Sequence, residues 1–95
     1  MTDPSLLVLS SLSGGDKHGY AIMRDIECFA GVRLGPGTLY GAITRLEERG
    51  MIRAIKTSGR RQPYAIRAEG RTSLQEQLVA LDKTVRTGLR RLRHI

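Results

Sequence analysis

Cationic and hydrogen-bonding side chains gather in two stretches of this sequence, and their chemistry is that of binding phosphates and base edges. The first stretch carries Thr38, Tyr40 and Arg45 away from the apolar stripe of a predicted helix. The second, residues 56–62, forms a basic turn. Arginine, lysine and hydroxyl side chains commonly contact the backbone of a nucleic acid, and arginine also reads guanine. The pattern therefore predicts a surface that binds nucleic acid.

The sequence lacks the residue patterns typical of an enzyme active site or a metal centre. Its single cysteine, Cys28, excludes an internal disulfide framework and any CxxC metal site, and its two histidines, His18 and His94, lie at opposite ends. We find no acid/base pair placed by spacing on one face and no phosphate-binding P-loop. We therefore predict no enzymatic activity, no metal and no cofactor. We interpret Cys28 as a packing or neutral residue and His18 as a residue that caps or packs at a helix start.

Charge is divided unevenly along the 95 residues, whose net charge is +7. Residues 1–50 hold 5 basic and 6 acidic side chains, whereas residues 51–95 hold 11 basic and 3 acidic ones. A basic half suggests a polyanionic partner: nucleic acid first, an anionic membrane surface second, with a solvated basic face as the alternative. No apolar run has the length of a membrane span or follows basic residues as in a signal peptide, so we expect a cytoplasmic protein without membrane contact.

Three short helices separated by glycine-containing turns are predicted to position the first stretch. Asp3-Pro4 begins the first helix and Gly14-Gly15 ends it. The second opens at Asp16 or His18 and ends at Gly31, and the third spans residues 36–49. Apolar residues at i, i+4 and i+7 should face the core in the last two helices: Ile22, Ile26 and Phe29, then Leu39, Ile43 and Leu46.

A β-hairpin and a long helix complete the predicted fold. Residues 51–57 and 64–66 favour two strands, and Pro63 must stand at an edge or a strand start because it has no N–H to donate. The last helix should begin at about Glu69 or Thr72. It carries a heptad seam typical of a dimerisation helix, widened by Leu89 and interrupted by Gly88. The seam comprises Leu74, Leu78, Leu81, Val85, Gly88, Leu92 and Ile95.

This order, three helices and then a hairpin, is that of a winged helix-turn-helix. The fold class is therefore mainly α with a small β-hairpin, followed by a coiled-coil-like C-terminal helix. We expect a winged-helix DNA-binding domain over 1–68 and a dimerisation helix over 69–95. The predicted DNA contacts are Tyr20, Gly37, Thr38, Tyr40, Gly41, Thr44, Arg45, Lys56, Arg60 and Arg61. Core packing is the alternative for Tyr20. For Tyr40 the alternative is a half-buried ring that packs the wing against the third helix, and for the rest it is a solvated surface.

Several motifs resemble the PadR-type transcriptional regulators. They are His18-Gly19-Tyr20 with Ile22, the run Leu34–Tyr40, Leu46-Glu47, Gly50–Ile52, and Tyr64, Ile66, Gly70 and Arg71. The resemblance covers roughly residues 5–80. It implies a dimeric DNA-binding repressor of the shorter subfamily, whose last helix packs on the partner subunit. Gly35 and Arg67 depart from the family's usual capping residues, and the absence of tryptophan argues against carrying over drug stacking.

Two functions follow as hypotheses. The first is a homodimeric repressor that places helix 36–49 in the major groove of double-stranded DNA and wing 56–62 on the flanking minor groove or backbone, with release by a small-molecule effector. The alternative is a winged-helix module that binds another protein and no specific DNA sequence, because fold alone does not fix function.

Overall fold

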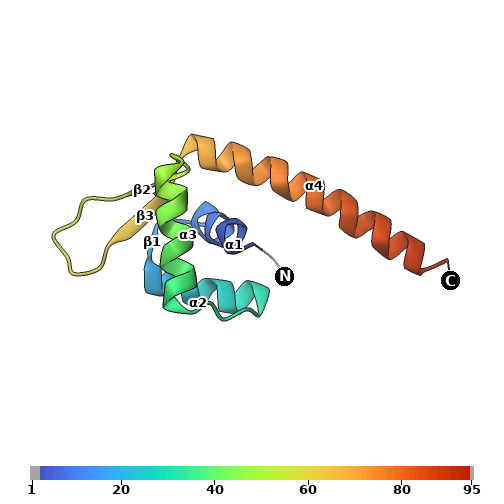
Figure 1. Cartoon of the computed structure of the whole chain (residues 1–95), viewed down its shortest axis with the longest axis horizontal. Helices are drawn as coiled ribbons and strands as arrows, with labels where there is room; N and C mark the ends of the chain where they lie inside the picture. The colour runs from blue at the N-terminus through green and yellow to red at the C-terminus, as the bar shows by residue number, and fades with distance from the viewer. Residues whose placement is uncertain (1–2, 95) are drawn as a thin grey trace.

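The computed structural model describes residues 3–94, and it has the predicted order of elements with one addition. The elements are α1 (Pro4–Ser13), β1 (Lys17–His18), α2 (Gly19–Ala30), α3 (Pro36–Glu48), β2 (Ile52–Ala54), β3 (Pro63–Ile66) and α4 (Ala68–Leu92). Residues 3–74, apart from the loop 55–62, form one packed body, here called the head, from which that loop and the rest of α4 extend (Figure 1). The predicted fold class, mainly helical with a small sheet, is confirmed.

Helix α1 lies at the centre of the head. It begins as predicted, since the Asp3 carboxylate accepts a hydrogen bond from the Ser5 N–H and Pro4 occupies the first turn. Helices α2, α3 and α4 and strand β3 all pack against it. Nearly every side of α1 is therefore apolar and buried, as expected for a helix without a solvent face: Leu6, Leu7, Val8, Leu9 and Leu12.

The two helices of the helix-turn-helix end at glycines in the left-handed region. Gly31, with φ of 66°, closes α2, and Gly50, with φ of 73°, follows α3. After α3 the Met51 N–H reaches the Leu46 carbonyl at 2.9 Å and the Gly50 N–H reaches Glu47, the pair of bonds known as a Schellman motif. The predicted apolar stripes lie in the core, except that Phe29 is 50% exposed and its prediction as a core residue is wrong.

The sheet has three antiparallel strands in the order β1-β3-β2, rather than the two of the predicted hairpin. The added strand is Lys17–His18, where His18 pairs with Pro63. Pro63 stands at a strand start, as expected, but β3 is the central strand, so the edge alternative is wrong. Tyr64 and Ala65 are both buried, and because neighbouring side chains of a strand point to opposite faces, β3 is covered on both faces at these positions.

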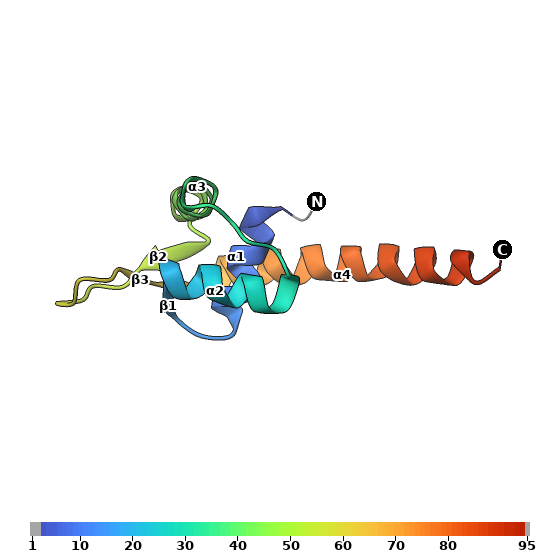
Figure 2. The same ribbon diagram turned by 90° about the horizontal axis from the view of Figure 1, so that it is seen from below.

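Helix α4 begins at Ala68, one residue before Glu69, and the alternative start at Thr72 is wrong. Arg67 occupies the N-cap position of α4, and its side chain makes no capping hydrogen bond. Gly70 lies against the backbone of Met51, where a Cβ would also lie 2.9 Å from Ile66 Cγ1, so only glycine allows this approach. Leu74 enters the head's core, and the helix then projects away from the head (Figure 2). Ile95, the last predicted seam position, lies outside the described residues.

Candidate nucleic-acid interface

Helix α3 buries one face and presents the other to solvent. Leu39, Ala42, Ile43 and Leu46 pack into the head. Thr44 and Arg45 are exposed on the opposite side, and the Thr44 hydroxyl donates to the Tyr40 carbonyl at 2.9 Å. A Cβ built at Gly41 would lie 3.5 Å from a terminal nitrogen of Arg45, so the guanidinium extends along the helix beside that glycine. This face has the composition predicted for a surface that enters a groove.

The first turn of α3 is open to solvent. Gly35 stands at the N-cap without a capping side chain, and Pro36 occupies the first helical position. Gly37 and Thr38 are exposed beside it. A helix of this kind has free backbone N–H groups at its start, and these bind an anion where one is present.

Two tyrosines border this face. Tyr40 is 47% exposed, and its ring covers Gly19 at the start of α2, where a Cβ would lie 2.7 Å from Cζ. Tyr20 is 51% exposed, so it is not a core residue. Its hydroxyl accepts a hydrogen bond from Arg24 at 3.2 Å, which raises the pKa of the Arg24 guanidinium. The hydroxyl proton of Tyr20 remains available to an acceptor outside the chain.

The wing is the segment 55–62 between β2 and β3, and it protrudes from the head (Figure 1). Lys56, Arg60 and Arg61 are all exposed on it. Gln62 holds the base of the wing together, since its side-chain amide donates to the carbonyls of Ile55 and Pro63 at 2.8 Å each. The wing therefore presents three cations on a loop whose two ends are fixed.

The wing meets the start of α2 at His18. Arg61 Nη1 lies 3.1 Å from His18 Nε2, while His18 Nδ1 accepts from the Ala21 N–H at 3.2 Å and caps the helix. The capping role is the one expected for His18. Its place beside the predicted DNA contacts was missed, because sequence spacing gives no sign that residues 18 and 61 lie side by side.

A surface hollow brings together four of the ten predicted contacts. Its lining residues are His18, Gly19, Tyr20, Tyr40, Arg60, Arg61 and Gln62. Gly37, Thr38, Gly41, Thr44 and Arg45 lie instead along α3, and Lys56 lies elsewhere on the wing. The predicted residues therefore form a hollow between helix and wing, an adjoining helix face and one separate lysine.

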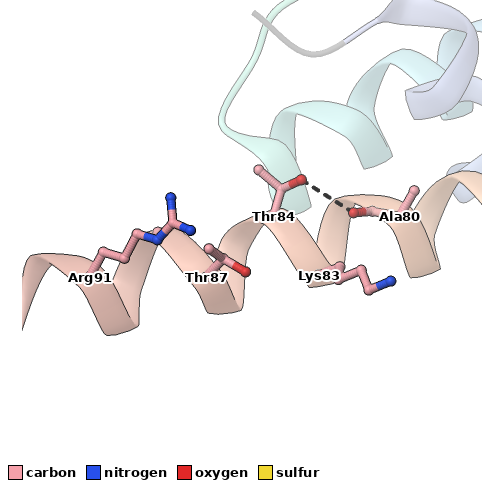
Figure 3. A pocket seen from close by; sticks show the side chains of 6 residues that line it. Ala80, Lys83, Thr84, Thr87 and Arg91 are labelled. Atoms are coloured by element: carbon pink, nitrogen blue, oxygen red, sulfur yellow. Dashed lines mark hydrogen bonds between the residues drawn. The ribbon is translucent and has the colours of Figure 1, made fainter.

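The seam of α4 divides into a buried start and an exposed remainder. Leu74 is 5% exposed and belongs to the head's own core, where it has little surface left for another chain. Later members of the same stripe are exposed to 44–65%: Leu78, Leu81, Val85, Leu89 and Leu92. Lys83, Thr87 and Arg91 line a shallow depression on the same helix, and the seam position Gly88 also belongs to its lining (Figure 3).

Three further observations bear on the expected chemistry and on membrane contact. Within residues 3–94, no group of three or more His, Cys, Asp or Glu side chains is placed to hold a metal ion. Cys28 is exposed on α2, so its interpretation as a packing residue is wrong. Of the helices in the same range, none has the length and apolar character needed to cross a membrane.

Comparison with known proteins finds a relative by sequence and several solved structures of similar fold. An uncharacterized 37.1 kDa protein in transposon TN4556 of Streptomyces fradiae is 44% identical over 75 residues. The match covers 79% of this chain but only 22% of that protein. A transcriptional regulator from Clostridium thermocellum has a similar structure, with a TM-score of 0.79 and 29% identity over 88% of this chain and 84% of that one.

Bacillus subtilis PadR, solved in complex with operator DNA, shares the fold at 20% identity with a TM-score of 0.67, over 79% of this chain and 46% of that one. The model of the Transcriptional regulator PadR-like family matches residues 8–76. That family consists of transcriptional regulators, and this assignment supports the expectation that the chain is not an enzyme. The match includes the motifs at the start of α2, along α3 and from Tyr64 to Arg71. The chain therefore belongs to the Transcriptional regulator PadR-like family.

Proposed function

We propose that this chain is a homodimeric, DNA-binding repressor. Each subunit places α3 in the major groove of one half-site, and the wing contacts the flanking minor groove or backbone. The observation that carries the proposal is that Tyr20, Tyr40, Arg60 and Arg61 line one hollow beside the exposed outward face of α3. The complex of Bacillus subtilis PadR with operator DNA supports it as a precedent for the same fold.

The charges of this surface favour DNA over a protein partner. Four ion pairs occur among residues 3–94, and they use Lys17, Arg33, Arg67 and Arg86. Lys56, Arg60 and Arg61 take part in none of them, so the wing's cations are available to phosphates. A module that only binds another protein has no need for unpaired arginines at the tip of a wing.

The proposed division of labour places DNA binding in residues 1–68 and dimerisation in residues 69–95. The exposed stripe of α4 supports the second half of this division, because apolar residues in a heptad pattern are stabilised by a partner helix. Two copies joined by α4 would hold their α3 helices about one turn of DNA apart on a roughly palindromic operator. A small effector bound between the head and α4 would release DNA by shifting the two heads, and the regulator would act in the cytoplasm.

The test is fluorescence anisotropy of a labelled duplex from upstream of the chain's own gene, beside a scrambled duplex, over a range of salt concentrations. We expect specific binding about a thousandfold tighter than binding to the scrambled duplex. Replacing both Arg60 and Arg61 with Glu should abolish binding, whereas Arg90→Glu with Arg91→Glu on α4 is the control that keeps it. Equal, weak and salt-sensitive binding to both duplexes, or none, would contradict the proposal and favour the protein-binding module.

A further inference from the structure

The contact between the wing and α2 joins two hydrogen-bond donors. His18 Nδ1 accepts from the Ala21 N–H, so this nitrogen carries no proton and the ring's proton sits on Nε2. Arg61 Nη1 lies 3.1 Å from that Nε2, and a guanidinium has donors but no acceptor. The N–H of His18 and the N–H of Arg61 thus lie together at the rim of the hollow, and neither satisfies the other.

We infer that this donor pair binds one backbone phosphate of the DNA, with His18 as a contact of its own. The inference rests on the proposed function and adds a residue and a ligand group to it. A phosphodiester offers two anionic oxygens, so it can accept from Nε2 and from the guanidinium at once, which removes the donor-to-donor conflict. Charge-assisted bonds of this kind are shorter and stronger than neutral ones.

The walls of the hollow suit an anion. Both arginines of the wing, Arg60 and Arg61, line it, and none of its lining residues is acidic. On the other side, the Tyr20 hydroxyl accepts from Arg24 and so keeps its own proton for donation outward. Tyr40 forms part of the wall and is held there by its packing on Gly19. Cationic and neutral donors from α2, α3 and the wing thus converge without a competing carboxylate.

The pairing of β1 with β3 already holds the base of the wing beside the N-terminus of α2. One phosphate shared by His18 and Arg61 would add a second connection between these two DNA-contacting parts. Once one of the two donors has been removed, removing the other should cost less affinity than it does in the unmodified chain. The losses from two independent phosphate contacts would instead add.

The first experiment is a double-mutant cycle with the full chain and the duplex of the preceding section. His18→Asn keeps an oxygen that can cap Ala21 but removes the outward donor. We expect His18→Asn to weaken binding about three- to tenfold and Arg61→Gln about tenfold. The double variant should bind about threefold more tightly than the product of the two losses predicts. His94→Asn, the same change at the other end of the chain, should leave the affinity unchanged.

A second measurement uses the unmodified protein, so it does not depend on the folding of a variant. Imidazole ¹⁵N spectra should show the His18 proton on Nε2 in the free chain and a shift of this N–H when duplex is added. A proton on Nδ1, an unshifted Nε2, an unaffected His18→Asn variant or fully additive losses would overturn the inference while leaving DNA binding intact. Failure of the unmodified protein to bind duplex would instead overturn the proposed function, and this inference with it.

Discussion

The ring of Tyr40, on the helix proposed to enter the groove, rests directly on the backbone of Gly19 at the start of the preceding helix. The absence of a side chain at position 19 creates the space that the ring fills. Both residues belong to the motifs by which the sequence resembles its family. The structure explains why they occur together, since the Tyr40 ring needs the space that Gly19 leaves. Together they set where the Tyr40 hydroxyl lies relative to the wing.

Gly19→Ala should displace the Tyr40 ring rather than unfold the head. The new methyl group would meet ring atoms of a side chain that is 47% exposed and can swing outward. We expect a loss of about 1 kcal/mol in the free energy of unfolding, at the low end for overpacking, and weaker DNA binding. Urea unfolding and anisotropy measure the two effects. In a Tyr40→Ala background the same substitution should cost no stability, and a persistent cost there would refute the proposed contact.

Gly70→Ala should be far more damaging, because its methyl group would meet main chain. A Cβ at position 70 would lie against the Met51 carbonyl and 2.9 Å from Ile66 Cγ1, and neither α4 nor β2 can move without disturbing the core. We expect a loss of about 2–3 kcal/mol, measured by urea unfolding. Gly41→Ala is the control: this glycine lies inside α3, outside the proposed dimer seam, and its added methyl would meet only the flexible Arg45 guanidinium, at 3.5 Å. That variant should gain up to about 1 kcal/mol from helix propensity, so equal losses at both positions would contradict this account.

The helices were predictable from the sequence because their boundaries have local chemical signals. Asp3-Pro4, Gly31 and Gly50 act through their own capping and backbone preferences, and all three lie at the expected helix ends. Strand β1 was not predictable, since two residues cannot show a periodicity of two. Its existence depends on pairing with residues 63 and 64, far along the chain.

The candidate site was only partly predictable for a similar reason. The exposed positions of α3 follow from its apolar stripe, which leaves one face outward. The meeting of His18 with Arg61 is a tertiary contact over 43 positions, and no local pattern encodes it. For Phe29 the local pattern was misleading, because its spacing predicts a core position. The last turn of α2 extends beyond the helices that would cover it, so the Phe29 ring remains half exposed.

The exposed stripe of α4 should hold two chains together. Leu81 and Val85 are 45% and 54% exposed, and replacing both with Asn would place amide groups in the proposed helix pair. We expect a dimer for the unmodified chain and a folded monomer for this variant in sedimentation velocity at micromolar concentration. Lys83→Asn with Thr87→Asn is the matched control, because each position lies two residues after Leu81 or Val85 and so points away from the seam in a helix of 3.6 residues per turn. A monomeric unmodified chain, or dissociation by the control pair, would rule out this seam as the dimer contact.

Tyr64 should make the head sensitive to alkali. Burial in β3 raises the pKa of its phenol, since the folded interior disfavours the phenolate. A group whose pKa is higher in the folded state contributes full stability below its unfolded value, about 10, and loses that contribution as pH rises toward the folded value. The difference in unfolding free energy between the unmodified chain and Tyr64→Phe should therefore be constant from pH 7 to about pH 9 and should shift in favour of the Phe variant above pH 10. Urea unfolding at each pH measures it, and Tyr20→Phe, at an exposed position, is the control. A difference that stays constant through pH 11 would show that the phenol ionises equally well in the folded and unfolded chain.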